Sequence, residues 1–201
     1  CLFVAYTRGM TKRMLNMAGA LALTLLAGCD PGDDGALTPD DLAGRYASGD
    51  CEDYPDGMGG HNYLTRDFTL TAEAWHLELA IYMDDACTTK LFSSVIDGPY
   101  TLGEPSTRVE GATEGAFKFT TNKWTAHQGF MADTFTRAGC GAAPWVVGEA
   151  QDVAMTGCIG VAHPLADCPQ EYDVVALSGD DLYFGERVTD MCSADGRPQA
   201  L

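Results

Sequence analysis

The sequence has few basic residues. Its 201 residues include 12 Lys and Arg against 29 Asp and Glu, a formal net charge of −17. A nucleic-acid-binding protein needs cationic side chains to neutralise phosphates, and an acidic surface is likewise repelled by anionic lipid. We therefore expect no nucleic-acid partner.

Motifs of metal centres and hydrolases are also missing. No Cys-x-x-Cys or His-x-x-x-His spacing occurs, and the acids of residues 30–34 do not fall at the alternating positions of a calcium loop. No Gly-x-Ser-x-Gly turn is present. We therefore expect no metal, no cofactor and no enzyme activity. Several residues could still supply an acid–base pair or triad in principle: His61, Asp67, Glu114, His127, Asp173 and several serines.

Residues 1–28 contain no Asp or Glu. Arg8, Lys12 and Arg13 precede an apolar run over residues 14–27, which is typical of a secretory signal peptide and too short to span a bilayer. The run ends in Leu-Ala-Gly-Cys at residues 26–29, which resembles the lipobox of bacterial lipoproteins. That resemblance implies cleavage before Cys29 and a diacylglyceryl group on its sulfur. The alternative is ordinary secretion, with Cys29 as a spare thiol.

This interpretation divides the chain into a leader over residues 1–28, an acidic tether over residues 29–41 and one domain over residues 42–201. Within the tether, Thr38 and Pro39 could cap and begin one helical turn. No second long apolar run follows, so we expect the Cys29 lipid to be the only membrane attachment. The expected location is the cell envelope, with the domain facing the periplasm or the exterior.

Six cysteines remain after Cys1 and Cys29 are set aside. An even number in an exported chain predicts a disulfide framework, and six cysteines allow fifteen pairings. We predict that Cys51 pairs with Cys87, which closes a loop of about 36 residues and stabilises the fold by roughly 4 kcal/mol. The sequence leaves the pairing of the other four open. The six are Cys51, Cys87, Cys140, Cys158, Cys168 and Cys192.

Most of the domain has the pattern of short β-strands. Residues 63–71 and 75–83 predict a hairpin, because apolar residues alternate in the second arm at Leu77, Leu79, Ile81 and Met83. Further strands are expected over residues 42–48, 91–96, 100–102, 111–120, 171–177 and 182–185, with a possible one at 145–147. One helix is expected over residues 124–138. The fold class is therefore mainly β, an antiparallel barrel or half-barrel (lipocalin-like) with one helix, stapled by disulfides.

Ordered short motifs resemble the APCDD domain, that of the adenomatosis-polyposis-coli-down-regulated protein. They are Gly44-Arg45-Tyr46, Cys51-Glu52, residues 63–68, Asp84, Cys87, Leu91-Phe92, residues 111–114, Cys158, Cys168, residues 171–175, residues 182–185, Thr189-Asp190 and Arg197-Pro198. The resemblance implies a barrel-like extracellular domain with a hydrophobic pocket. Animal members carry two such domains and a transmembrane helix, and they bind lipid-modified Wnt proteins and inhibit Wnt signalling. A bacterial lipoprotein has no Wnt ligand, so only the pocket for an acyl chain is carried over.

The inward face of the predicted strands gives the candidate pocket. Its expected lining is Phe68, Leu70, Trp75, Leu77, Leu79, Ile81, Phe117 and Phe119, although the same side chains could simply fill a small barrel. Arg66 and Glu114 could lie inside the barrel as a buried ion pair. We expect a monomeric, membrane-anchored domain that binds a hydrophobic ligand, such as a lipid or acyl chain, or a lipidated protein. Alternatives are an envelope interaction or structural lipoprotein without a pocket and, less favoured, a hydrolase.

Overall fold

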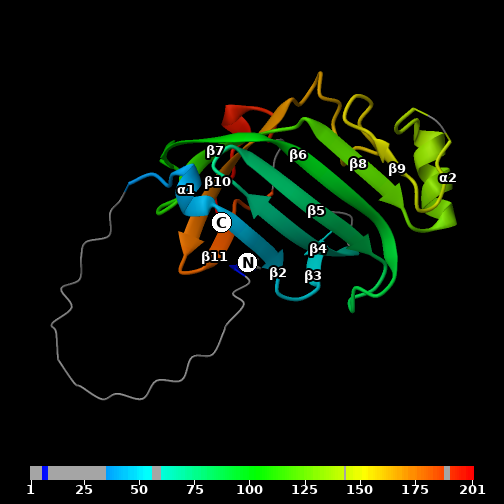
Figure 1. The fold of residues 1–201 in the computed structure, drawn as a ribbon, viewed down its shortest axis with the longest axis horizontal. Helices are drawn as coiled ribbons and strands as arrows, with labels where there is room; N and C mark the ends of the chain where they lie inside the picture. Colours follow the sequence, from blue (N-terminus) through cyan, green and yellow to red (C-terminus); the bar gives the residue numbers. More distant parts are fainter. Residues whose placement is uncertain (1–5, 9–34, 56–59, 143, 188–190) are drawn as a thin grey trace, which may run out of the picture.

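The structure is a computed structural model that describes residues 6–8, 35–55, 60–142, 144–187 and 191–201. Most of the chain forms one antiparallel sheet of eleven strands, which curls into a nearly closed barrel and so confirms the predicted fold class (Figure 1). Most of the predicted leader, Cys29 and the first part of the tether lie outside the described residues. The predicted division of the chain at residues 28 and 41 therefore stays a prediction.

The folded domain opens with one helical turn, α1 (Pro39–Leu42). The Asp41 carboxylate accepts hydrogen bonds from the Thr38 backbone N–H at 2.7 Å and the Thr38 hydroxyl at 2.6 Å. Pro39 occupies the first position, where its missing N–H costs no hydrogen bond. The predicted helical turn is therefore present, and it places Leu42 in the core.

The expected hairpin is formed by β4 (His61–Leu70) and β5 (Ala74–Tyr82). Their register sets Phe68 opposite Leu77 and Leu70 opposite Trp75, so the apolar residues of both arms share one face. Two short strands pair with β4 on its other side, β2 (Gly44–Ser48) near its end and β3 (Glu52–Pro55) near its start. The sequence analysis had not anticipated β3.

The longest strand is β6 (Lys90–Pro105), which is continuous where the sequence predicted two strands separated by a turn at Asp97-Gly98. Its first half lies between β5 and β8 (Thr121–Ala126), and its second half pairs with β7 (Thr113–Lys118). Gly98 is required by close packing rather than by a turn, because a Cβ atom there would lie 1.8 Å from the Lys118 carbonyl oxygen. The predicted break was therefore wrong.

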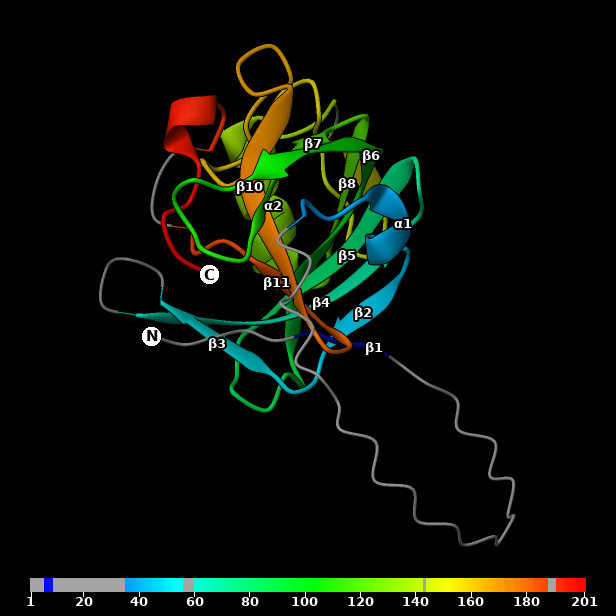
Figure 2. The ribbon, with the colours of Figure 1, turned by 90° about the vertical axis from the view of Figure 1, so that its left-hand side faces the viewer.

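The ring of strands continues from β7 through β10 (Gln170–Ser178) and β11 (Asp181–Phe184), the second predicted hairpin. It is completed by β1 (Tyr6–Arg8), whose backbone pairs with both β11 and β2 (Figure 2). The sequence analysis placed these three residues in the leader and predicted no strand there. The sheet also extends beyond the ring, because β9 (Ala150–Asp152) pairs with the free edge of β8.

The predicted helix begins later than expected. α2 spans Gly129–Ala138 and ends at Gly139 as predicted, whereas Trp124 and Ala126 belong to β8. Both side chains are buried on one face of that strand, a spacing of two that tertiary pairing with β6 favours over a helix. The strand suggested at residues 145–147 is irregular instead, and the Trp145 N–H donates a hydrogen bond to the hydroxyl of Thr136 on α2. A short 3₁₀ turn, η1 (Ala194–Gly196), lies near the carboxyl end.

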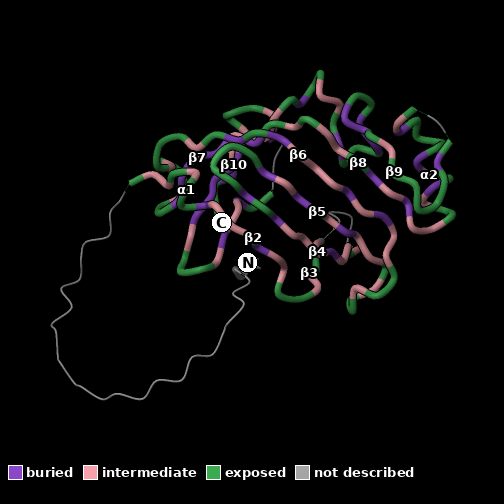
Figure 3. Tube along the Cα trace, viewed as in Figure 1, coloured by how far each residue is buried: buried purple, intermediate pink, exposed green. Residues whose placement is uncertain are grey.

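Buried residues lie along most strands and on α2 (Figure 3). They form two main clusters. The cluster at the barrel end joins α1 to the ring of strands and includes Tyr46, Leu70, Tyr100 and Leu182. The other packs α2 and the segment after β9 onto β6 and β8, and includes Phe135, Trp145 and Val153 among others. The space between these two clusters holds the candidate site.

Three disulfides staple the loops around the sheet. Cys51 joins Cys87, the predicted pair, which ties the segment before β3 to the turn between β5 and β6. The pairings that the sequence left open are Cys140 with Cys158 and Cys168 with Cys192. The former fastens the end of α2 to the segment after β9, and the latter fastens the start of β10 to the carboxyl-terminal segment. This framework fits an oxidising extracellular or envelope location.

The contact at Gly98 makes a testable prediction. Gly98→Ala should lower the free energy of unfolding by at least about 2 kcal/mol, because the new methyl group must push the β7 backbone away from β6. Gly103→Ala on the same strand is the matched control, since its nearest neighbouring atom would be 3.6 Å away, and it should change stability by less than about 0.5 kcal/mol. Urea unfolding of both variants measures the difference. Equal effects would contradict the packing argument.

Candidate functional site

A cavity of about 540 Å³ lies between the two core clusters. This volume is within the range of about 300–1,000 Å³ that is typical of small-ligand pockets. Seven of the eight predicted lining residues contribute to its wall, and Leu70 is instead packed into the barrel core. The seven are Phe68, Trp75, Leu77, Leu79, Ile81, Phe117 and Phe119.

Strand alternation positions this wall. Every second residue of β5 faces the cavity, and so do Phe92, Ser94 and Ile96 of β6. A pair of stacked aromatic rings lies at each end of the cavity. Phe68 stacks on Phe184 at the barrel end with ring centroids 4.6 Å apart, and Phe92 stacks on Trp124 at the other end at 4.8 Å. The cavity is therefore an apolar space bounded by aromatic rings at each end.

The segment after β9 forms a wall that the sequence analysis missed, because it has no strand or helix periodicity. Ile159, Val161, Ala162 and Leu165 line the cavity there, and the disulfide from Cys158 to Cys140 holds the segment against α2. Ile159 and Val161 are also 42% and 62% exposed to solvent. Since these two side chains border both the cavity and the solvent, they mark a mouth of the cavity.

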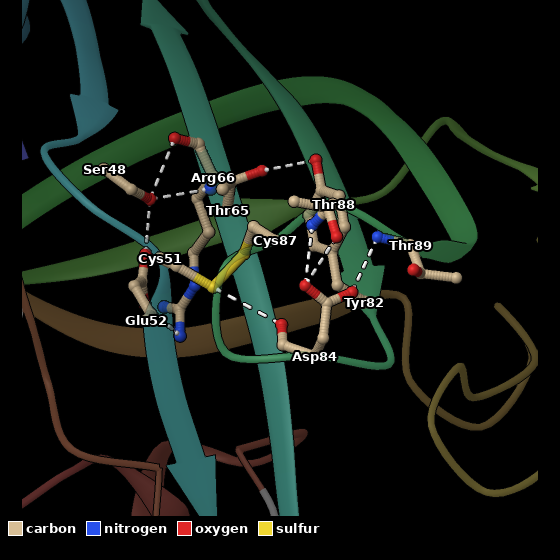
Figure 4. The surroundings of a disulfide bond; sticks show 10 residues. All are labelled: Ser48, Cys51, Glu52, Thr65, Arg66, Tyr82, Asp84, Cys87, Thr88 and Thr89. Carbon is tan, nitrogen blue, oxygen red and sulfur yellow. Dashed lines mark hydrogen bonds and ion pairs between the residues drawn. A yellow bond between two sulfur atoms is a disulfide. The ribbon is translucent and has the colours of Figure 1, made fainter.

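The polar pair expected inside the barrel is not Arg66 with Glu114. Arg66 does face the cavity, and its guanidinium lies 3.3 Å from the carboxylate of Glu52 (Figure 4). Glu52 also accepts a hydrogen bond from the Ser48 hydroxyl, and burial raises the pKa of its carboxyl. Both partners reach the inner face because Glu52 on β3 stands directly opposite Leu64 on β4.

Glu114 lies on the opposite face of β7 from the buried Phe117. Its carboxylate pairs with Arg197 at 2.8 Å, and the Arg197 guanidinium lies 5.1 Å from the centre of the Tyr172 ring. This pair therefore fastens the carboxyl-terminal segment to the outside of the sheet. The predicted Arg66–Glu114 pair was wrong because ion-pair partners on different strands depend on sheet topology, which residue spacing does not reveal.

A second polar group of the cavity lies on β10, where Glu171 and Asp173 share the inner face with Val175. Glu171 forms an ion pair with Arg187 of the segment after β11, with Oε1 3.3 Å from one guanidinium nitrogen. Asp173 is only 4% exposed. The sequence could have indicated this group, because Glu171 and Asp173 are spaced two residues apart in line with Val175, and residues at that spacing share one face of a strand.

The Asp173 carboxyl is held by the backbone. Its Oδ1 atom accepts hydrogen bonds from the N–H groups of Val174 at 2.7 Å and Gly185 at 3.0 Å. Burial raises the pKa of Asp173 to about 7, and the Arg187 guanidinium and the two N–H donors only partly oppose this effect. A carboxyl with such a pKa is costly to keep charged at neutral pH, which is common at binding and catalytic sites.

Asn122 adds a neutral polar group to the wall. Its Oδ1 atom accepts hydrogen bonds from the Ser94 hydroxyl and the Trp124 indole N–H, both at 2.7 Å. An indole N–H can only donate, so this geometry fixes which end of the amide is the oxygen. The Asn122 amide is thereby oriented among aromatic and aliphatic neighbours in the cavity wall.

The candidate catalytic residues do not converge. Ser93 and His127 come within 2.9 Å on the outer side of β6, and among the described residues no carboxylate is hydrogen-bonded to His127. His61 contacts Asp53 at 2.6 Å, and Asp67 pairs with Arg45 at the surface. The expectation of no enzyme activity remains a prediction.

The described part of the chain contains no group of three or more His, Cys, Asp or Glu side chains that could hold a metal ion. No helix within it has the length and apolar character needed to cross a bilayer. Lipidation of Cys29 and the absence of a cofactor stay predictions.

The chain matches a known protein family. The model of the family described as adenomatosis polyposis coli down-regulated 1 matches residues 33–144. The match covers more than half of the 201 residues and runs from before α1 to just beyond α2. It confirms the resemblance derived from the sequence motifs. Strands β10 and β11, which contribute Glu171, Asp173 and Phe184 to the cavity wall, lie after the matched segment.

The buried Asp173 predicts a pH dependence of stability. Its pKa is about 7 in the folded protein and ordinary, about 4, in the unfolded chain. The folded state therefore holds the proton more tightly between these pH values, and stability falls as pH rises through this window. Asp173→Asn should be more stable than the wild type at pH 8, by up to about 4 kcal/mol, and equally stable near pH 4. Denaturant unfolding at pH 4, 6 and 8 measures this difference.

Asp84→Asn provides a control of opposite sign. Hydrogen bonds from Thr88 and Thr89 lower the pKa of Asp84 to about 2, so its ionised form stabilises the fold. This variant should be less stable than the wild type at neutral pH. A stability gain from Asp173→Asn that is the same at pH 4 and pH 8 would contradict the assigned cause.

Proposed function

The chain belongs to the adenomatosis polyposis coli down-regulated 1 family, and on that basis we propose that it is an extracytoplasmic binding domain for the acyl chain of a lipid or of a lipidated partner. Family membership supports an extracellular domain of the binding type, and the three disulfides fit such a location. The proposal includes attachment to a membrane through a lipid on Cys29, action as a monomer, and no catalysis.

The observation that carries this proposal is the lining of the cavity. Leu79, Ile81 and Ile96 form an aliphatic wall between the two aromatic ends, and they are only partly buried although they face inward. A barrel whose side chains filled its interior would bury these residues fully. An acyl chain entering the cavity would remove their apolar surface from water, which stabilises a complex by about 25 cal/mol per Å² before the costs of binding.

A specific observation also favours an interaction module. Six of the seven large hydrophobic residues that are exposed in the described structure lie on α2 or in the segments around β9. Exposed apolar residues in one part of a surface mark interaction sites. A lipidated protein could use both features, its acyl chain in the cavity and its polypeptide on this surface. The six are Phe130, Val146, Val147, Met155, Ile159 and Val161.

The first test is native mass spectrometry of the purified, oxidised protein, followed by solvent extraction of any bound molecule. We expect a co-purifying mass that extracts as a fatty acid, a phospholipid or another acyl compound. A protein that purifies without ligand and stays empty when acyl compounds are added would overturn the pocket. The interaction surface around α2 would then be the better-supported function.

Cavity-filling variants provide the matched prediction. Diphenylhexatriene, an uncharged rod that fluoresces in apolar surroundings, should bind the wild-type protein, and Leu79→Trp and Ile96→Trp should each weaken that binding at least about tenfold by occupying the cavity. Glu78→Trp is the control, because its side chain lies on the other face of β5 and is 68% exposed. Equal loss of binding in Glu78→Trp would place the probe outside the cavity. Circular dichroism verifies that each variant folds.

A further inference from the structure

Asp173 is the one cavity-lining acid, among the described residues, that makes no ion pair. Its Oδ1 atom is satisfied by two backbone N–H groups, whereas Oδ2 has no hydrogen-bond partner in the described structure. Asp173 is one of the residues that line the cavity, so its carboxyl group borders this open space. A buried carboxylate oxygen that faces open space needs a donor, from water or from a ligand.

The two arginines that line the cavity already form ion pairs with carboxylates. Arg187 is bound through two nitrogens to Glu171, and Arg66 lies against Glu52. An arginine that is engaged by a carboxylate has little charge left to attract a second anion. The unmet requirement on the cavity wall is therefore a hydrogen-bond donor at Asp173, because no cationic side chain of the described residues forms an ion pair with its carboxylate.

We propose that the ligand is a single-chain amphiphile whose head is a hydrogen-bond donor, an amine or a hydroxyl group, bound to Oδ2 of Asp173. This inference rests on the proposed function and specifies its ligand class. The chain of such a molecule lies along the aliphatic wall of Leu79, Ile81 and Ile96. An amine head gains a charge-assisted hydrogen bond, and a hydroxyl head gains a neutral one.

A carboxylate head is disfavoured at the same position. It would bring a second negative charge beside Asp173 and Glu171, and like charges in a poorly hydrated site repel each other strongly. The charged groups that act on Asp173 are Arg187 and Glu171. Arg66 and His163 also line the cavity. The site therefore discriminates between amphiphiles of equal chain length by the charge of the head.

A purely structural role for Asp173 can be separated from ligand binding. The hydrogen bond from Gly185 ties the end of β11 to β10, and that role needs only Oδ1. Asp173→Asn keeps an oxygen acceptor for both backbone N–H groups and replaces the free oxygen with an NH₂ group. The substitution should therefore preserve the fold and, apart from the gain in stability expected at pH 8, change the preference for the ligand head.

The test is displacement of bound diphenylhexatriene by three ten-carbon amphiphiles, decylamine, decanol and decanoate, at pH 8. We expect decylamine to bind most tightly, decanol less tightly and decanoate at least about tenfold more weakly than decylamine. In Asp173→Asn the preference of amine over carboxylate should be lost. Decylamine stays protonated between pH 6 and pH 8, as a lysine side chain does. Its affinity for the wild type should fall at pH 6, because Asp173 then takes up a proton.

The acidity of the whole protein also attracts amines, and Asp133→Asn controls for this effect. It removes one negative charge from the exposed surface of α2 and should leave the order of the three amphiphiles unchanged. The inference would be overturned by equal affinities for the three amphiphiles, or by an order of affinities that is unchanged in Asp173→Asn. Binding of the probe would in that case still support the cavity. Failure of the wild type to bind the probe would instead overturn the proposed function.

Discussion

The architecture depends on the close approach of two backbones at Gly98. Because no side chain stands there, β6 passes the Lys118 carbonyl group, and the Trp75 indole donates a hydrogen bond of 2.9 Å to the same oxygen. One continuous strand can therefore pair first with β5 and β8 and then with β7. The barrel and the sheet that extends from it are joined through this strand, and the cavity occupies the space between them.

The interior of the protein combines good packing at its ends with imperfect packing in its middle. Fully buried residues such as Tyr46, Leu182 and Phe135 lie in the two clusters, where they supply the hydrophobic stabilisation of the fold. The cavity between them leaves aliphatic side chains partly uncovered and keeps a carboxyl group away from water. Both features lower the stability of the empty protein, which is the usual relation between a binding site and its scaffold.

The features that could be predicted from the sequence are those set by neighbouring residues along the chain, such as the alternation of apolar side chains within a strand. Alternating apolar residues in β4 and β5 predicted the hairpin and five of the seven cavity residues, and the same alternation at Phe117 and Phe119 predicted the other two, since the pleat of a strand fixes which side chains share a face. Leu70 was the exception, because its place beside Trp75 at the end of the hairpin puts it in the barrel core. The Cys51–Cys87 pair was also predictable, because the two residues flank one hairpin.

Features that depend on distant parts of the chain could not be predicted. Asp97-Gly98 has the composition of a turn, and only the approach of Lys118 explains why a strand passes through it. Trp124 and Ala126 fit a helix or a strand equally well until β6 pairs with them. The partners of Arg66 and Glu114 come from β3 and from the carboxyl-terminal segment, which residue spacing alone does not bring together.

β1 closes the barrel by pairing with β2 on one side and β11 on the other. β2 and β11 both run antiparallel to β1 and pair with its two opposite edges, so they are parallel to each other with one strand between them. If Tyr6–Arg8 leaves with the rest of the predicted leader, each neighbour presents unpaired N–H and C=O groups along one side, and the barrel becomes an open trough. Such edges recruit other strands. Loss of β1 would therefore leave two edges at which a strand of another chain could pair.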